Sequence, residues 1–341
     1  MNSGRGPWSR FKAALDAAGF HPSRRYGQNF LLDENMVRAI VRDAKVGPGD
    51  RVLEVGAGCG FLTYHLAEAG ADVLSVEVDR RLWAIATELC QETGKVRILR
   101  ADAMAGKHEL NPEVRAALPA EGAWHVVANL PYSISAPLLV VLGALPNPPD
   151  SMTVLVQLEV ALRMAAQPGG EGSGSSKTWG PLSIRLQLDH DVELVRRVPP
   201  ELFWPRPQVH SAVVRLRRRQ AAVEGELRAR LDELVSVLFQ RRRQALGRVL
   251  GEHIGDRAQG RGMLEKLGID SRRRAETLQL AELCALAQAL PASRSPSASR
   301  SSPPGQADAP GGAAEGPTSP EAPPAERRSS RDSGAEPEKG A

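Results

Sequence analysis

The sequence predicts an α/β fold: a doubly wound, mostly parallel sheet, then a small helical domain and a disordered tail. Between Arg51 and Arg217 short β-branched runs alternate with helical stretches, as in βαβ units. Strand signals then vanish, and apolar residues recur at helical spacing. The last segment is Pro, Ser, Gly, Ala and charged residues, with little to bury. The predicted boundaries are 1–219, 220–290 and 291–341.

Seven runs have the composition of strands, and four stretches between them that of helices. The strand candidates are RVLEV, DVLSVEV, KVRIL, WHVVA, MTVLVQ, VELVRRV and AVVRL. The helix candidates are 61–68, 80–92, 136–145 and 159–166. No helix separates the last two strands, which predicts an antiparallel hairpin at one edge of the sheet. The Gly- and Ser-rich stretch from Gln167 to Gly180 is predicted to be a flexible loop.

Composition narrows the class of protein. The 341 residues are 42% hydrophobic, enough for one full core and a smaller one. No apolar stretch approaches the roughly 20 residues of a membrane span, and no secretory signal is visible, so we expect a cytoplasmic protein without a membrane partner. Cys59, Cys90 and Cys284 match neither a disulfide framework nor a metal site, so we expect no metal. The net charge of +4 is compatible with a polyanionic partner.

The glycines of LEVGAGCG predict a loop that holds a nucleotide-like cofactor. Gly56, Gly58 and Gly60 follow a strand and precede a helix, where missing side chains let a ligand approach backbone N–H groups. Their GxGxG spacing disfavours a nicotinamide dinucleotide, which needs GxGxxG. An ordinary tight turn is the alternative for the glycines taken alone.

Carboxylates end the next two strands at the same edge of the sheet. DVLSVEVD ends in Glu77 and Asp79, and we assign to Glu77 the acceptance of both ribose hydroxyls of a cofactor. Asp102, in RADAM, can accept the exocyclic amine of an adenine. A helix cap or turn residue is the alternative for Asp102 alone.

The fourth strand runs into NLPYS, which has the groups that methylation of an adenine amine requires. Pro131 fixes an extended turn carrying Asn129, the Leu130 carbonyl and the Tyr132 ring. The amine is a poor nucleophile because its lone pair is delocalised into the ring. Two acceptors, the Asn129 side-chain oxygen and the Leu130 backbone oxygen, can localise that pair, while Tyr132 stacks on the base. A buried loop with a capping Asn and a core Tyr is the alternative.

These segments resemble the KsgA family of small-subunit ribosomal RNA adenine dimethyltransferases. The resemblance covers roughly Arg24 to Leu290 and rests on several motifs in order: YGQNFL, EVGAGCG, EVD, ADAM, NLPYSIS, FWPRPQVHSAVVRL, QRRRQALGRVL and LGIDSRRRAETL. It implies a Rossmann-like methyltransferase domain whose cofactor is S-adenosylmethionine. It also implies the residues that contact the cofactor: Gln28, Asn29 and Leu31 in an N-terminal covering segment, with Gly56, Gly58, Glu77, Asp102 and Asn129.

The resemblance further implies the substrate and its contacts. The substrate would be two adjacent adenines in a loop near the 3′ end of small-subunit ribosomal RNA, dimethylated on N6 as an immature 30S-type subunit is assembled. Phe203 is the candidate for a second stacking face opposite Tyr132, with core packing as the alternative. Arg241, Arg242 and Arg243 are candidates for phosphate contacts, as are the Arg clusters 215–219 and 272–274, with solvated helix faces as the alternative.

Four positions depart from the family pattern, and three other functions stay open. Ser133 replaces a usual Asn, Gln208 and His210 a usual Lys and Asp, and Trp179 a usual Tyr. The alternatives are a large-subunit adenine methyltransferase of the macrolide-resistance type, a non-catalytic assembly or transcription factor of this fold, and a nicotinamide oxidoreductase, which the GxGxG spacing disfavours. LGID and AETL favour the small subunit. We expect a monomer.

Overall fold

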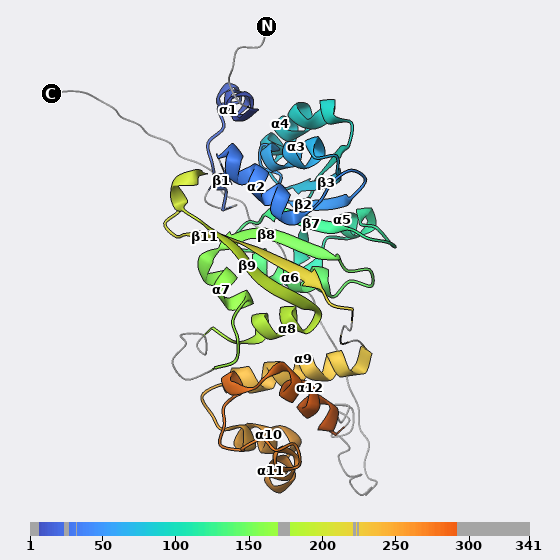
Figure 1. Ribbon diagram of the computed structural model, residues 1–341, viewed down its shortest axis with the longest axis vertical. Helices are drawn as coiled ribbons and strands as arrows, with labels where there is room; N and C mark the ends of the chain where they lie inside the picture. The colour runs from blue at the N-terminus through green and yellow to red at the C-terminus, as the bar shows by residue number, and fades with distance from the viewer. Residues whose placement is uncertain are drawn as a thin grey trace, which may run out of the picture. The chain divides into compact units, whose positions relative to one another are not determined.

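A seven-stranded sheet forms the centre of this computed structural model (Figure 1), which describes residues 7–23, 27–31, 33–169, 178–220, 223 and 225–291. The predicted tail beyond Pro291 and residues 170–177 of the predicted loop lie outside the described residues. No helix in the described ranges is long and apolar enough to cross a membrane.

The sheet has the doubly wound order that the alternation of elements predicts. All neighbours pair in parallel except β11, which is antiparallel to both β8 and β9. The predicted antiparallel hairpin of β9 and β11 is therefore confirmed. In it β9 is the edge strand of the sheet, and β11 lies between β8 and β9. In spatial order the strands are β4 (Val96–Arg100), β3 (Asp72–Glu77), β2 (Arg51–Val55), β7 (His125–Asn129), β8 (Ser151–Gln157), β11 (Ser211–Arg218) and β9 (His190–Val198).

Helices cover both faces of the sheet (Figure 1). The four helix predictions are confirmed within a few residues, whereas the sequence patterns did not indicate α1, α2, α5 and α8. On one face pack α1 (Pro7–Ala17), α2 (Glu34–Ala44), α3 (Phe61–Glu68) and α4 (Arg80–Cys90). On the other pack α5 (Pro112–Ala117), α6 (Ser135–Gly143), α7 (Leu158–Met164) and α8 (Pro181–Asp189).

Alternation along the strands divides the apolar residues between two cores. Val127 points into the core under α1 to α4, while its neighbours Val126 and Ala128 point into the core under α5 to α8. Successive side chains on a strand face opposite sides, so a sheet that is covered on both faces needs near-continuous apolar runs. This requirement explains why the central strands β7 and β8 are apolar over most of their length.

Two small pairings lie beside the main sheet, and three short 3₁₀ helices complete the described elements. The first pairing joins the N-terminal segment to a residue pair just before β11. The second closes a loop after β4. The members are β1 (Phe30–Leu31) with β10 (Phe203–Trp204), β5 (Met104–Gly106) with β6 (Glu109–Leu110), and η2 (Gln91–Thr93), η3 (Pro200–Leu202) and η4 (Ala275–Thr277).

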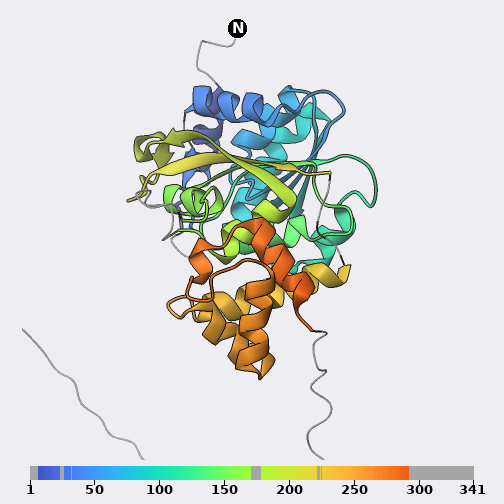
Figure 2. The ribbon, with the colours of Figure 1, turned by 60° about the horizontal axis from the view of Figure 1, so that its bottom comes forward.

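The C-terminal helices form a third core that crosses the predicted boundary at 219/220. They are α9 (Gly225–Gln240), α10 (Leu246–Ile254), α11 (Arg257–Lys266) and α12 (Leu280–Ala289), shown in orange in Figure 2. Their core also takes in Trp179, Ile184 and Leu188 from before the boundary. Helix α8 therefore packs on both sides, with Leu182 and Leu186 in the core of the sheet. The division into separate domains stays a prediction.

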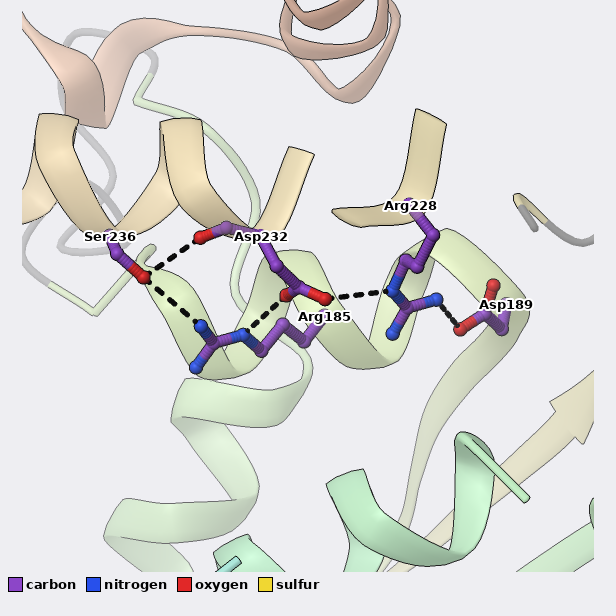
Figure 3. A network of polar contacts seen from close by, with 5 residues as sticks. All are labelled: Arg185, Asp189, Arg228, Asp232 and Ser236. Carbon is purple, nitrogen blue, oxygen red and sulfur yellow. Dashed lines mark hydrogen bonds and ion pairs between the residues drawn. The ribbon is translucent and has the colours of Figure 1, made fainter. Parts of the chain in front are cut away.

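Ion pairs reinforce this joint between α8 and α9 (Figure 3). Arg185 Nε donates to Asp232 Oδ1 at 2.8 Å, and its guanidinium also reaches Ser236 Oγ at 3.3 Å. Arg228 donates to the other Asp232 oxygen at 3.3 Å and to Asp189, whose side chain is only 7% exposed. Arg185 of α8 and Arg228 of α9 thus share the Asp232 carboxylate, and Arg228 also bonds Asp189 at the end of α8. These contacts set the orientation of α9 on α8.

Gly60, which begins α3, supplies the clearest test of packing in the glycine loop. Its φ is +90°, and a Cβ there would lie 2.9 Å from Cys90 Sγ and 3.1 Å from Ala86 Cα. We expect Gly60→Ala to lower the free energy of unfolding by about 3 kcal/mol, because backbone strain and overpacking add. Urea denaturation measures the loss. Gly262→Ala is the matched control: nothing lies within 4 Å of that Cβ in α11, so we expect equal or greater stability.

Candidate active site

One cavity at the carboxyl ends of β2, β3 and β7 brings together most of the residues that the sequence singles out. Parallel strands end at the same edge, so the loops that follow them converge there. Eleven of the twelve predicted cofactor- and base-contacting residues line it: Gln28, Asn29, Leu31, Gly56, Gly58, Glu77, Asp102, Asn129, Leu130, Pro131 and Tyr132.

Glu77, the last residue of β3, is hydrogen-bonded to the glycine loop that follows β2. Its carboxylate accepts the Gly58 N–H at 2.7 Å and the Asp79 N–H at 2.9 Å. Asp79 caps α4 and also accepts the Gln28 side-chain amide at 3.2 Å, which connects the N-terminal segment to this edge. The Glu77 side chain is buried, and burial raises its pKa to about 7. A carboxylate that can lose its proton near neutral pH is thus held beside the loop.

Asp102 makes a turn contact and also lines the cavity. Its Oδ1 accepts the Met104 N–H at 3.0 Å, the turn interaction that a lone Asp predicts. The residue is nevertheless exposed and lines the cavity, so its carboxylate keeps acceptor capacity for a ligand amine.

The NLPY loop is held between the N-terminal segment and the sheet. Asn129 donates its side-chain N–H to the Asn29 carbonyl at 3.0 Å, which assigns Oδ1 as the acceptor end of the amide. The Leu130 N–H donates to the Leu155 carbonyl at 3.1 Å. A Cβ on Gly56 would lie 3.3 Å from Pro131 Cδ, so the glycine loop packs directly on this turn.

Tyr132 is positioned by one hydroxyl contact and cannot serve as a base. Its hydroxyl lies 3.1 Å from Ser211 Oγ, the first residue of β11. Burial raises the pKa of the Tyr132 hydroxyl, so it stays protonated at neutral pH. The ring contributes a partly exposed face to the cavity, not a proton acceptor.

Phe203 is not among the residues that line this cavity. Its side chain is 4% exposed in the core under α1 to α4, where β10 pairs with β1 and Leu31 lies opposite it. The packing alternative describes this environment, and the stacking role of Phe203 stays a prediction. Its neighbour Trp204 is 37% exposed instead.

Glu54 is a cavity residue that the sequence reasoning missed. It is 1% exposed, and its Oε2 accepts Thr63 Oγ1–H at 2.5 Å and Ser75 Oγ–H at 2.7 Å. Burial raises its pKa to about 7, and the nearby Glu77 charge acts in the same direction. The available signal was a carboxylate in the interior of the strand RVLEV, flanked by apolar residues.

Glu54 makes the stability of the cofactor-free protein depend on pH. Below pH 4.5, the ordinary pKa of a glutamate, the Glu54 carboxyl is protonated in both the folded and the unfolded protein. As the pH rises towards about 7, the unfolded chain loses this proton first, so the folded state becomes less stable relative to the unfolded one. Glutamine cannot ionise. As the pH rises from 5 to 8, we therefore expect the free energy of unfolding of Glu54→Gln to increase by up to about 3 kcal/mol relative to that of wild type. Thermal unfolding at both pH values measures this, with exposed Glu88→Gln as the control. An equal effect at both pH values would refute the assignment.

The arginine clusters are mostly paired within the protein. Arg215 and Arg219 bond Glu193 and Asp191, and Arg273 bonds Glu282 at 2.6 Å. In the cluster that the family resemblance covers, Arg241 pairs with Glu252, while Arg242 and Arg243 are exposed and have no carboxylate partner among the described residues. Phosphate contact by this cluster stays a prediction.

The four departures from the family pattern fall in two environments. Ser133, Gln208 and His210 are exposed. Trp179 is 3% exposed, and its indole N–H donates to the Leu278 carbonyl at 3.2 Å. It therefore anchors the third core instead of belonging to a flexible substrate loop.

The cavity fits a nucleoside cofactor. Gly56 and Gly58 have positive φ, and a Cβ on Gly58 would lie 3.1 Å from the Phe30 ring, so only glycine leaves this wall open. Glu77 supplies a buried acceptor for ribose hydroxyls, and Asp102 an acceptor for an adenine amine. In the described ranges no three His, Cys, Asp or Glu side chains are grouped to hold a metal ion. Burial raises the pKa of the cavity thiol Cys59 to about 12, so it is no nucleophile.

This sheet order, with a glycine loop, an acidic end to the next strand and NLPY, defines a Rossmann-like methyltransferase that uses S-adenosylmethionine. The chain belongs to the ribosomal RNA adenine dimethylase family, which matches residues 19–291. It is similar to proteins named ribosomal RNA small subunit methyltransferase A. The one from Moorella thermoacetica is 37% identical over 81% of this chain and 95% of its own length. That of Leifsonia xyli is 39% identical over 77% of this chain and 91% of its own.

Two solved structures share the fold. A dimethyladenosine transferase from Plasmodium falciparum has a TM-score of 0.62 and 23% identity, covering 74% of this chain and 94% of its own. The 23S rRNA methyltransferase ErmE has a TM-score of 0.59 and 26% identity, covering 76% of this chain and 99% of its own. The fold is thus shared with a dimethyladenosine transferase and with a methyltransferase of 23S rRNA.

Proposed function

We propose that this protein dimethylates N6 of two adjacent adenosines in a loop near the 3′ end of small-subunit ribosomal RNA. The observation that carries the proposal is the single cavity shared by the glycine loop, the edge carboxylates and NLPY. The choice of RNA is supported by relatives that are 34–39% identical and are named for the small subunit.

The residues of the cavity have separate tasks in this proposal. Glu77 and Asp102 hold the ribose hydroxyls and adenine amine of S-adenosylmethionine, which supplies an electrophilic methyl group on its sulfonium. Asn129 Oδ1 and the Leu130 carbonyl accept hydrogen bonds from the substrate amine and orient its lone pair. Tyr132 stacks on the base. The amine is neutral and can release its proton to water afterwards, so no strong base is required.

The target must be unpaired to reach this cavity. Taking a base out of its stack costs a few kcal/mol, least in a loop or single strand. Arg242 and Arg243, exposed and unpaired with carboxylates among the described residues, are the proposed phosphate contacts. We further propose that the protein acts as a monomer in the cytoplasm on an immature small subunit.

A second candidate is methylation of large-subunit RNA, because ErmE shares the fold at 26% identity. A non-catalytic binding factor is the third. The test is to incubate the purified protein and labelled S-adenosylmethionine with undermethylated small subunits and, separately, with large-subunit RNA, and then to identify the modified nucleosides. We expect dimethyladenosine in small-subunit RNA alone. Label only in large-subunit RNA would favour the second candidate, and cofactor binding without label the third.

A further inference from the structure

Trp204 is the accessible aromatic residue of the segment between β9 and β11. In the pairing of β10 with β1, Phe30 lies opposite Trp204 and Leu31 opposite Phe203. Side chains alternate along a strand, so the two adjacent rings point to opposite sides: Phe203 is 4% exposed and Trp204 37%. The ring that this segment offers to a partner is therefore Trp204.

Trp204 contacts the wall of the cofactor cavity. Its ring stacks on Phe30 with centroids 5.8 Å apart and planes inclined by 29°, and Phe30 lines the cavity. Phe30 in turn packs on Gly58 of the glycine loop. Trp204 thus stacks on a cavity residue, and 37% of its surface is exposed.

The far end of the same segment is connected to the predicted base-contacting loop. Ser211, which follows it, lies within hydrogen-bond distance of the Tyr132 hydroxyl. The segment also exposes Arg206, paired with Glu201, and Val209, which is 44% exposed. Surface ion pairs contribute little, so a phosphate can take the place of Glu201. A partly exposed ring two residues before an exposed arginine suits a nucleotide, because bases stack on rings and arginine pairs with phosphates.

We propose that Trp204 stacks on a nucleobase that neighbours the target adenosine in the RNA, and so positions the strand over the cavity. This inference rests on the proposed function. Trp204 is a positioning residue, since it touches a base other than the one that is being methylated. Every base has a π face, so the contact holds the strand without selecting a sequence.

The steady-state test uses small subunits and three variants. We expect Trp204→Ala to raise KM for the subunit about tenfold, as loss of one base–aromatic stack does, with kcat within about twofold of wild type. Trp204→Phe keeps a stacking ring, so we expect its KM within about threefold of wild type. Leu267→Ala removes a side chain of the same 37% exposure from the helical region and should leave KM unchanged. Cofactor affinity without RNA and thermal unfolding control for damage to the Phe30 packing.

A direct readout separates stacking from other effects. The probe is an RNA with the fluorescent base 2-aminopurine beside the target adenosine. Its fluorescence should be quenched when the RNA binds wild type or Trp204→Phe, and much less when it binds Trp204→Ala. If wild type methylates small subunits while Trp204→Ala matches it in KM and quenching, the stacking is wrong and the proposed function stands. If wild type methylates no small-subunit RNA, the proposed function fails. The fluorescence measurement then tests the stacking by itself. Quenching that is lost in Trp204→Ala supports stacking by Trp204, and the absence of such quenching overturns it.

Discussion

Replacing Asn129 with alanine should lower turnover on small subunits at least about 100-fold, because an oriented acceptor contributes a few kcal/mol in the transition state. We expect cofactor affinity to change less than about threefold, since the ribose and adenine acceptors remain. Single-turnover methylation with saturating S-adenosylmethionine measures the first quantity and calorimetry the second. Near-normal turnover would remove the proposed mechanism.

The structure adds a control to this experiment. Asn129 also donates to the Asn29 carbonyl, so alanine loses both an acceptor and a contact to the N-terminal segment. Asn129→Asp keeps oxygen acceptors but cannot donate there, and we expect it to retain more turnover than alanine. Asn147→Ala removes an amide that bonds the Pro119 and Gly122 carbonyls instead, and should leave turnover near wild type.

Glu77→Gln should weaken S-adenosylmethionine binding about 100-fold at pH 8, because charge-assisted hydrogen bonds to both ribose hydroxyls are lost. The ratio of the wild-type affinity to the variant's affinity should be about tenfold smaller at pH 6 than at pH 8. Burial places the pKa of Glu77 near 7 in the cofactor-free protein, so at pH 6 most wild-type molecules must first release that proton.

Calorimetric titrations of both proteins from pH 6 to pH 8 provide the measurement. The ratio of the two affinities is the quantity to plot, because titration of the cofactor itself cancels in it. Glu88→Gln, an exposed carboxylate on α4, is the matched control and should follow wild type at every pH. A ratio that stays constant with pH would show that Glu77 does not bind the cofactor in its ionised form.

Much of the cavity could be predicted because its residues follow strands directly. Gly56, Glu77, Asp102 and Asn129 each come at or just after the end of a parallel strand, and such ends meet at one edge by construction. The N-terminal contacts at Gln28 and Asn29 came only from the family resemblance, since no local pattern says what a coil segment covers.

Residues whose role depends on a distant partner were not predictable. Glu54 is tuned by the burial and hydroxyls that α3 and β3 provide. Phe203 is buried and Trp204 partly exposed because β10 pairs with β1, more than 170 residues earlier in the chain. Nothing local in FWPRP shows which ring faces the core.

By itself, the sequence determined the alternation of the seven main strands with helices and the sheet edge at which the predicted site residues meet. Local periodicity, glycine positions and strand ends carry that information. Only the tertiary structure decided how the C-terminal helices join the sheet. Trp179 bonds Leu278 across 99 residues, and α8 lies between two cores. Such contacts depend on which faces pack together, and that is a property of the whole fold, not of any segment.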